Sequence, residues 1–237
     1  MFKHKKLSVD LPELSIQYKW AKRFYETPGG NLVPSVTTVL SLLDREAIDA
    51  WRARVGKEEA DRIAVYCRNR GNVFHEIAEQ YLNNELDESE IIMPMFKELF
   101  GLLKKELDSH VDDIQATEMC MWSDRLGLAG TTDCIGNYDS KLSVIDFKTS
   151  FRAKKEEWIA KYFAQCWAYA CMFQERTGVQ INQVVIFIAC DDGTMQTFIQ
   201  NSMDLKRKYV KLIIETTAKF NEEIKELESQ VKIGELN

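Results

Sequence analysis

Two carboxylates and a lysine fall within one short stretch of the sequence. Asp146 and Lys148 are two positions apart, so both side chains emerge on the same face of a β-strand. Asp133 lies in the preceding strand-like run, and the polar linker Asp139-Ser140-Lys141 predicts a hairpin that places the two runs side by side. Paired carboxylates supply hard oxygen ligands for Mg²⁺, and a neighbouring lysine supplies a cation beside the attacking water. The stretch therefore fits Mg²⁺-assisted cleavage of a phosphodiester bond.

A histidine upstream has the spacing to join these groups. Gly71, His75 and Glu79 follow one another at intervals of four, so they share one face of a predicted helix. Glu118 lies on a predicted strand whose alternation aims it at the same cleft. Glu79 and Glu118 are candidates for supporting partners of His75 or of metal-bound water, with ordinary surface carboxylates as the alternative. Taken alone, each feature is weak, because a single histidine on a partly apolar helix is usually structural.

The joint order of these motifs is more specific than any one of them. The chain contains, in order, Gly71-x-x-x-His75, Gly130-x-x-Asp133, Asp146-Phe147-Lys148-Thr149 and Gln165-x-x-x-Tyr169. This order resembles the PD-(D/E)xK nuclease superfamily in its RecB-like branch. The segment Pro34-Ser-Val-Thr-Thr-Val-Leu, with Trp51 and Arg52 beyond it, is similar to the part of that branch that contains the mitochondrial genome maintenance exonuclease and related phage exonucleases.

The resemblance covers about residues 34–190 and departs from the pattern at two positions. Thr132 stands where the superfamily has its proline, and Asp146 replaces the commoner glutamate; both changes are tolerated in the branch. The resemblance implies an α/β (α+β mixed) fold: a restriction-endonuclease-like core with a central mixed sheet flanked by helices, an N-terminal helical insertion and a long C-terminal helix. The two ends of the chain are not informed by the resemblance, and we expect a single nuclease domain over residues 1–237. Residues 1–110 form a hairpin and a helical region, 111–200 the catalytic sheet core, and 201–237 the C-terminal helix.

The same resemblance assigns the metal ligands. Asp133, Asp146 and the main-chain carbonyl of Phe147 are implied to ligate one or two Mg²⁺ ions, with His75 as a further ligand or facing a second ion. Because imidazole favours somewhat softer ions, Mn²⁺ is expected to substitute for Mg²⁺.

The lysine and two helical residues receive roles beside the metal. Lys148 is implied to orient water and to stabilise charge on the phosphate. Two neighbouring carboxylates raise the pKa of a lysine, so we do not assign Lys148 as the general base. Gln165 and Tyr169 share a helix face and are implied to contact water, phosphate or Lys148; a polar seam in the core is the alternative.

The N-terminal helices interleave basic and aromatic side chains, a combination that suits a flexible single strand. The predicted substrate-contacting residues are Ser35, Trp51, Arg52, Arg54, Arg68, Arg70 and Thr149. Acidic residues alternate with the basic ones, so an ion-paired solvated surface is the alternative. In the branch that the chain resembles, the helical segment covers the site and threads single strands. A metal-dependent exonuclease acting on single-stranded DNA ends is therefore expected, with replication or recombination proteins as partners.

The local signals predict the elements that position these residues. A turn is expected at Pro28-Gly-Gly-Asn31 and a helix capped by Ser35. Further helices are expected at 45–55, 57–83, 94–109, 156–177 and 204–231, and strands at 115–122, 129–138, 142–148, 184–190 and 194–200. The apolar stripe of the last helix predicts packing against the domain, with a dimeric coiled coil as the alternative.

Composition limits the remaining possibilities. The net charge of −6 argues against a protein that coats nucleic acid indiscriminately. Neither a membrane-length apolar stretch nor a signal peptide is visible, so a cytoplasmic location is expected, in the host cytoplasm if the chain is phage-encoded, with no membrane partner. The six cysteines are scattered, which predicts buried reduced thiols. Two alternatives stay open: an iron–sulfur RecB-like nuclease, and a non-catalytic module that binds DNA ends or recombination partners.

Overall fold

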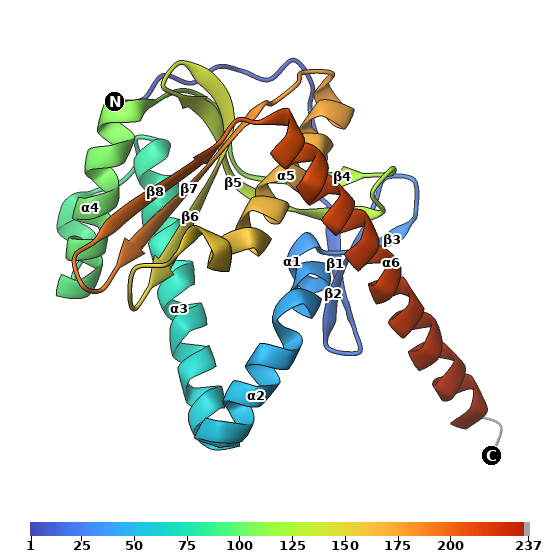
Figure 1. Cartoon of the computed structure of the whole chain (residues 1–237). Helices are drawn as coiled ribbons and strands as arrows, with labels where there is room; N and C mark the ends of the chain where they lie inside the picture. Colours follow the sequence, from blue (N-terminus) through green and yellow to red (C-terminus); the bar gives the residue numbers. More distant parts are fainter. Residues whose placement is uncertain (235–237) are drawn as a thin grey trace.

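The computed structural model describes residues 1–234 and contains two sheets (Figure 1). The central sheet has the strand order β4-β5-β6-β7-β8, with β4 Val111–Ser123, β5 Leu128–Tyr138, β6 Lys141–Ser150, β7 Gln183–Cys190 and β8 Met195–Gln200. Only β6 and β7 pair in parallel, so the sheet is mixed. A smaller antiparallel sheet contains β1 Ser15–Lys19, β2 Lys22–Glu26 and β3 Leu32–Pro34. This architecture confirms the predicted mixed α/β fold class.

Helices cover both faces of the central sheet, which buries β7 completely. One face packs against α3 Lys57–Leu82 and α4 Pro94–His110. The other face packs against α1 Val36–Leu40, α5 Ala160–Thr177 and α6 Met203–Gly234. The 3₁₀ turn Glu156–Ile159 and α5 form the crossover that a parallel β6–β7 pair requires.

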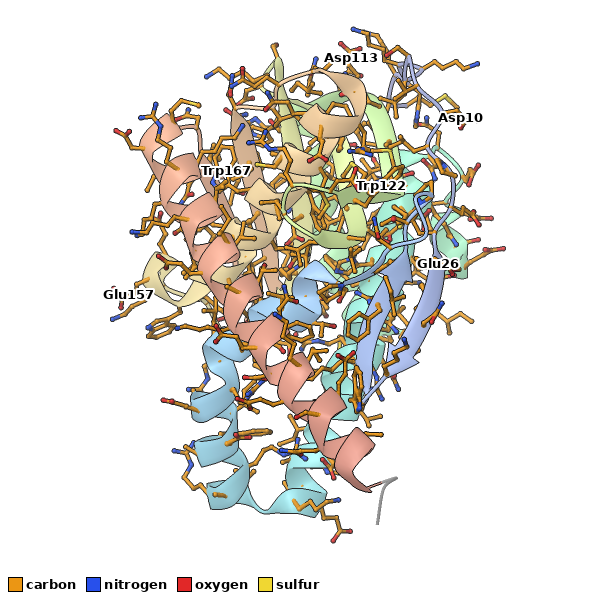
Figure 2. The ribbon with its side chains drawn as sticks, turned by 90° about the vertical axis from the view of Figure 1, so that its right-hand side faces the viewer. Asp10, Glu26, Asp113, Trp122, Glu157 and Trp167 are labelled. Carbon is orange, nitrogen blue, oxygen red and sulfur yellow. The ribbon has the colours of Figure 1, made fainter. Side chains whose placement is uncertain are left out.

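The long C-terminal helix packs on the domain, as its apolar stripe predicts. Tyr209, Ile213 and Phe220 are buried in the same core as Trp167 of α5. Figure 2 shows α6 running across this face of the molecule, with Trp167 labelled beside it. Residues 235–237, which belong to the predicted C-terminal segment, lie outside the described residues.

A helical arm projects from the body of the protein. After α1, the 3₁₀ turn Ser41–Asp44 leads into α2 Arg45–Val55, and α2 and α3 form a V that points away from the sheet (Figure 1). Gly56 separates the two helices at a φ of 88°, a left-handed value that favours glycine. The predicted break at this residue is confirmed.

Several boundaries differ from the sequence-based expectation; the helix expected from residue 156, for example, begins as the 3₁₀ turn Glu156–Ile159 and becomes α-helical at Ala160. Strand β4 begins at Val111, four residues earlier than predicted, because an irregularity in its pairing between Asp112 and Ala116 interrupts the alternation. The stretch from Tyr18 to Tyr25 contains a further hairpin, whose turn residues Trp20 and Ala21 both have positive φ. Such turns normally carry asparagine or glycine, so these residues gave no signal.

The helices among residues 1–234 include none that is both long enough and apolar enough to span a membrane.

Candidate active site

The candidate site is built around a fork between two strands. Strands β5 and β6 pair from Tyr138–Lys141 to Cys134–Ile145, whereas β6 continues beside β7 to Ser150. The carboxylate of Asp133 lies where the β5–β6 pairing ends, and its Oδ2 accepts a hydrogen bond of 2.7 Å from the main-chain N–H of Phe147. The side chain of Asp133 therefore supplies the hydrogen-bond acceptor for the N–H of Phe147 at the point where β5 no longer pairs with β6.

Three potential metal ligands meet beside this fork. The Nδ1 atom of His75 on α3 lies 3.3 Å from Asp133 Oδ1 and 3.9 Å from Glu118 Oε1 on β4. The potential ligand atoms of these three residues all lie within 4.8 Å of one another. Glu118 has a φ of 43°, a strained value of the kind that often marks functional sites. The sequence placed Glu118 in a supporting role, whereas the structure brings its carboxylate into the ligand group itself.

Asp146 and Lys148 lie next to this group on β6. Asp146 Oδ1 accepts a hydrogen bond of 3.1 Å from Gln165 Nε2 on α5. Its Oδ2 is 2.5 Å from Lys148 Nζ but without hydrogen-bond geometry, and it is one of three buried side-chain polar atoms in residues 1–234 that lack a hydrogen-bond partner. Lys148 also donates to the carbonyl oxygen of Phe147 at 3.3 Å. The carbonyl that was predicted to bind metal thus contacts the lysine.

Burial and charge shift the pKa values of these groups. Burial raises the pKa of Asp146 to about 6, and the negative charge of Asp133 adds to the effect. Burial disfavours the ammonium of Lys148, but the charges of Asp146 and Asp133 more than offset this and raise its pKa. Burial likewise disfavours the imidazolium of His75, yet Asp133 and Glu118 raise its pKa to about 10. The pKa of Lys148 is thus shifted in the direction expected for a lysine beside two carboxylates.

The raised pKa of His75 makes a prediction for the metal-free protein. Folded His75 keeps a proton that the unfolded chain loses above about pH 6.5, so protonated His75 stabilises the folded state. This contribution to the free energy of unfolding is complete below about pH 6.5 and is lost as pH rises towards 10. The difference in unfolding free energy between the native protein and His75→Gln should therefore shrink by about 2–3 kcal/mol between pH 7 and 9.5. Denaturant unfolding in EDTA measures it. A difference that is constant over this range contradicts the expectation.

The residues present fit a divalent cation. Two carboxylates and an imidazole form the ligand group, and the carboxylate of Asp146, which is ion-paired with Lys148, lies on the adjacent strand β6. Oxygen-rich groups with one imidazole suit Mg²⁺ and Mn²⁺. By contrast, all six cysteines carry free thiols, and the ligand group found among residues 1–234 contains none of them. The iron–sulfur alternative therefore receives no structural support.

The ligand group opens into a cavity of about 470 Å³. It is lined by Arg23, Thr37, Leu40, Ser41, Asn72, His75, Glu118, Thr131, Asp133, Lys148, Lys161, Tyr162, Gln165 and Tyr169. The sequence missed several of these residues, including Arg23 and Lys161. Asn72 could have been predicted, because it lies three positions before His75 and so shares its helix face.

Gln165 and Tyr169 both reach the site from α5, on the face that the sequence predicted. Tyr169 lies against Gly130, where a Cβ atom would come within 3.0 Å of its ring and hydroxyl. Burial raises the pKa of Tyr169 well above its usual value, so the phenol stays neutral. Gly130 therefore serves to leave space for this ring.

Glu79 lies near the ligand group without lining the cavity. It is half-buried, and burial together with the charge of Glu118 raises its pKa. This placement agrees with the supporting position that its spacing from His75 predicted.

The arm residues predicted to contact substrate do not line the cavity. Trp51, Arg52 and Arg54 belong to α2, and Gly56, which follows α2, is nineteen residues before His75. At 1.5 Å per residue, this distance along α3 is about 28 Å. Arg52 is also ion-paired with Asp61. Arg68 is exposed and lies on the His75 side of α3, nearer the site.

Three other predicted substrate contacts have structural partners instead. Ser35 is fully buried, and its hydroxyl caps α1 by accepting from the N–H of Thr38 at 3.0 Å. Arg70 is 4% exposed; it donates to both carboxylate oxygens of Asp191 and, at 3.2 Å, to the hydroxyl of Thr149. All three side chains thus have hydrogen-bond partners within the fold, which a sequence pattern of basic residues could not reveal.

The fold and the site together define a mixed α/β protein with a carboxylate–imidazole–lysine centre at a strand fork. No protein-family profile matches the sequence. The chain is similar to mitochondrial genome maintenance exonuclease 1 of Homo sapiens, with 30% identity over 137 residues, which is 52% of this chain and 38% of that protein. The chain thus matches about two fifths of the length of this curated relative.

A solved structure also bears some likeness to the chain. A presumed exonuclease from Eubacterium rectale aligns with a TM-score of 0.45 and 12% identity, covering 63% of this chain and 65% of that one.

Proposed function

We propose that this chain is a divalent-metal-dependent deoxyribonuclease, and more narrowly an exonuclease that acts on single-stranded DNA ends. The observation that carries the proposal is the ligand group of His75, Glu118 and Asp133, which lines one cavity together with Lys148, the ion-pair partner of the buried Asp146. The similarity to a human exonuclease supports the same activity. We also propose that the chain acts as one nuclease domain of the RecB-like branch, alongside replication or recombination proteins.

The side chains divide the work of phosphodiester hydrolysis among them. Asp133, Glu118 and His75 would hold the ion, with Asp146 on the adjacent strand as a further carboxylate. When bound, a divalent ion lowers the pKa of water and neutralises charge on the phosphate. Lys148 remains protonated, so it positions the water and stabilises the negative charge that develops on the attacked phosphate. Gln165 holds Asp146 in place through the hydrogen bond to Oδ1.

The decisive experiment compares DNA substrates that differ only in their ends. Linear single-stranded oligonucleotides with free, 5′-blocked or 3′-blocked ends and a circular single strand are incubated with Mg²⁺, Mn²⁺ or EDTA. We expect the linear strands to be shortened from a free end, the circle to resist, and EDTA to stop the reaction. The block that protects the strand gives the polarity, and a matching RNA oligonucleotide tests the sugar preference.

Three outcomes would contradict the proposal at different levels. Degradation in EDTA excludes the metal-dependent mechanism. Cutting of the circle at the linear rate excludes the exonuclease assignment. Retarded migration of DNA without turnover in either metal favours the non-catalytic binding module instead.

A further inference from the structure

The cavity has two chemically different sides. The acidic side contains His75, Glu118 and Asp133 and comes from α3, β4 and β5. The basic side contains Arg23 of β2, Thr37 of α1 and Lys161 of α5. The residues of the basic side have no role in the proposed chemistry at the ligand group. A cavity of about 470 Å³ falls in the size range of small-ligand sites, so there is room for more than the scissile phosphate.

Arg23 is held in place without being neutralised. Its Nη2 atom donates a hydrogen bond of 3.0 Å to the hydroxyl of Thr37. Its guanidinium lies 5.5 Å from the centre of the Tyr25 ring, which is 1% exposed. Among residues 1–234, no carboxylate lies within ion-pair distance of Arg23. A fixed guanidinium with free donors is suited to a phosphate, whose oxygens match its fork geometry.

Lys161 completes the basic side and connects it to the catalytic lysine. Its ammonium is ion-paired with Asp44 and lies 5.6 Å from the centre of the Tyr162 ring. The ammonium of Lys148 lies 5.4 Å from the centre of the same ring. One aromatic ring thus contacts both the catalytic lysine and the basic side. Because Asp44 compensates Lys161, Arg23 provides the uncompensated charge.

We infer that Arg23, Thr37 and Lys161 form a second phosphate-binding subsite, which holds a phosphate of the substrate strand other than the one that is cleaved. This inference rests on the proposed function and deepens it. The guanidinium of Arg23 faces the cavity, is fixed by Thr37 and Tyr25, and is not ion-paired with a carboxylate among the described residues, so a phosphate oxygen could accept hydrogen bonds from its free donors. A nucleic acid strand supplies such a ligand at each nucleotide, as an internal or as a terminal phosphate.

The test replaces Arg23 with glutamine, which removes the charge and retains a donor for Thr37. We expect KM for a single-stranded oligonucleotide to rise about 10-fold or more with kcat changed less than twofold. The slope of log binding constant against log salt, measured by fluorescence anisotropy in EDTA, should fall by about 0.7, the value for one phosphate contact on a single strand.

Two further variants control the result. Arg207→Gln removes the same charge from an exposed residue of α6 and should leave KM and the salt slope at the native values. Arg23→Lys keeps the charge but loses the planar guanidinium with its paired N–H donors, so its KM should lie between those of the native protein and Arg23→Gln. Circular dichroism melting checks that each variant is folded.

Oligonucleotides with 5′-phosphate, 3′-phosphate or hydroxyl ends identify the source of the phosphate. A terminal phosphate is indicated if Arg23→Gln loses affinity only for one phosphorylated end, and an internal phosphate if all strands lose affinity equally. The inference is overturned if Arg23→Gln degrades every oligonucleotide with the native KM and binds with the native salt slope. If the native protein degrades no DNA, the proposed function fails, and the anisotropy measurement alone decides the subsite.

Discussion

Replacing Asp133 with asparagine is expected to abolish nucleic acid hydrolysis while leaving the protein folded. The amide oxygen of asparagine can still accept the N–H of Phe147, so the strand fork keeps its hydrogen bond. The negative charge that would hold a divalent ion is lost. We expect kcat to fall by about a thousand-fold or more, the scale on which loss of one stabilising group acts in other enzymes. Steady-state assays with Mn²⁺ measure it, and calorimetric titration with Mn²⁺ should show weakened binding.

Asp133→Ala is the matched control, because it removes the acceptor as well as the charge. The buried N–H of Phe147 then has no partner, so the free energy of unfolding should be lower than in Asp133→Asn by about 1–3 kcal/mol. Denaturant unfolding of the two variants in EDTA separates the structural role of this residue from its chemical one. Equal stability of the two variants would refute the structural role of Asp133, and native activity in Asp133→Asn would refute its chemical role.

The second large effect is expected from Lys148→Met, which preserves bulk and removes the ammonium beside Asp146. We expect kcat to fall by about 10²–10³-fold, because charge on the attacked phosphate loses its stabilising cation. Lys148 also holds down the pKa of Asp146, so without it Asp146 is protonated to a higher pH than about 6. The folded state then binds a proton that the unfolded state lacks above about pH 3.8. The loss of stability should therefore be greater at pH 8 than at pH 6, by roughly 1–2 kcal/mol.

A double-mutant cycle isolates this coupling. In Asp146→Asn/Lys148→Met no charge is left buried at the pair, so most of the pH-dependent loss should disappear. Denaturant unfolding of the four proteins at pH 6 and pH 8 in EDTA provides the measurement. If Lys148→Met loses the same stability at pH 6 as at pH 8, the predicted coupling between Lys148 and the protonation of Asp146 is refuted.

The helices and strands were largely predictable because local signals agreed with the tertiary structure. Gly56 ended a helix, Gly178 ended another with a φ of 74°, and Asp139-Ser140 made the predicted hairpin turn. The turn at Trp20 and Ala21 was not predictable, because its positive φ values rest on neighbouring strands and not on the residues themselves.

The candidate site was predictable where spacing decides which residues meet. Asp146 and Lys148 share a strand face, and Gln165 lies four positions from Tyr169 on a helix face that reaches them. Glu118 was harder to place, because its left-handed backbone breaks the alternation on which a strand prediction depends. Alternation gives its general direction but not its entry into the ligand group.

Partners that are distant in sequence account for the remaining errors. Arg70 looked like a substrate contact in a run of basic residues, but Asp191, which binds it, is 121 positions away. Arg23 was not a candidate in the sequence, although the small sheet carries it to the cavity. Contacts between residues that are distant in sequence cannot be predicted from the local sequence pattern.

The parallel pairing of β6 with β7 has a consequence for the order in which the protein acquires its site. The strand that carries Asp146 and Lys148 is framed on one side by β7, whose first residue follows the last residue of β6 by 33 positions. Contacts between residues far apart in sequence form late, since loop closure must precede them. During synthesis, residues 1–150 would leave the ribosome with all the potential ligands but an open strand edge. The candidate site is therefore expected to form only after the crossover helix and β7 have emerged.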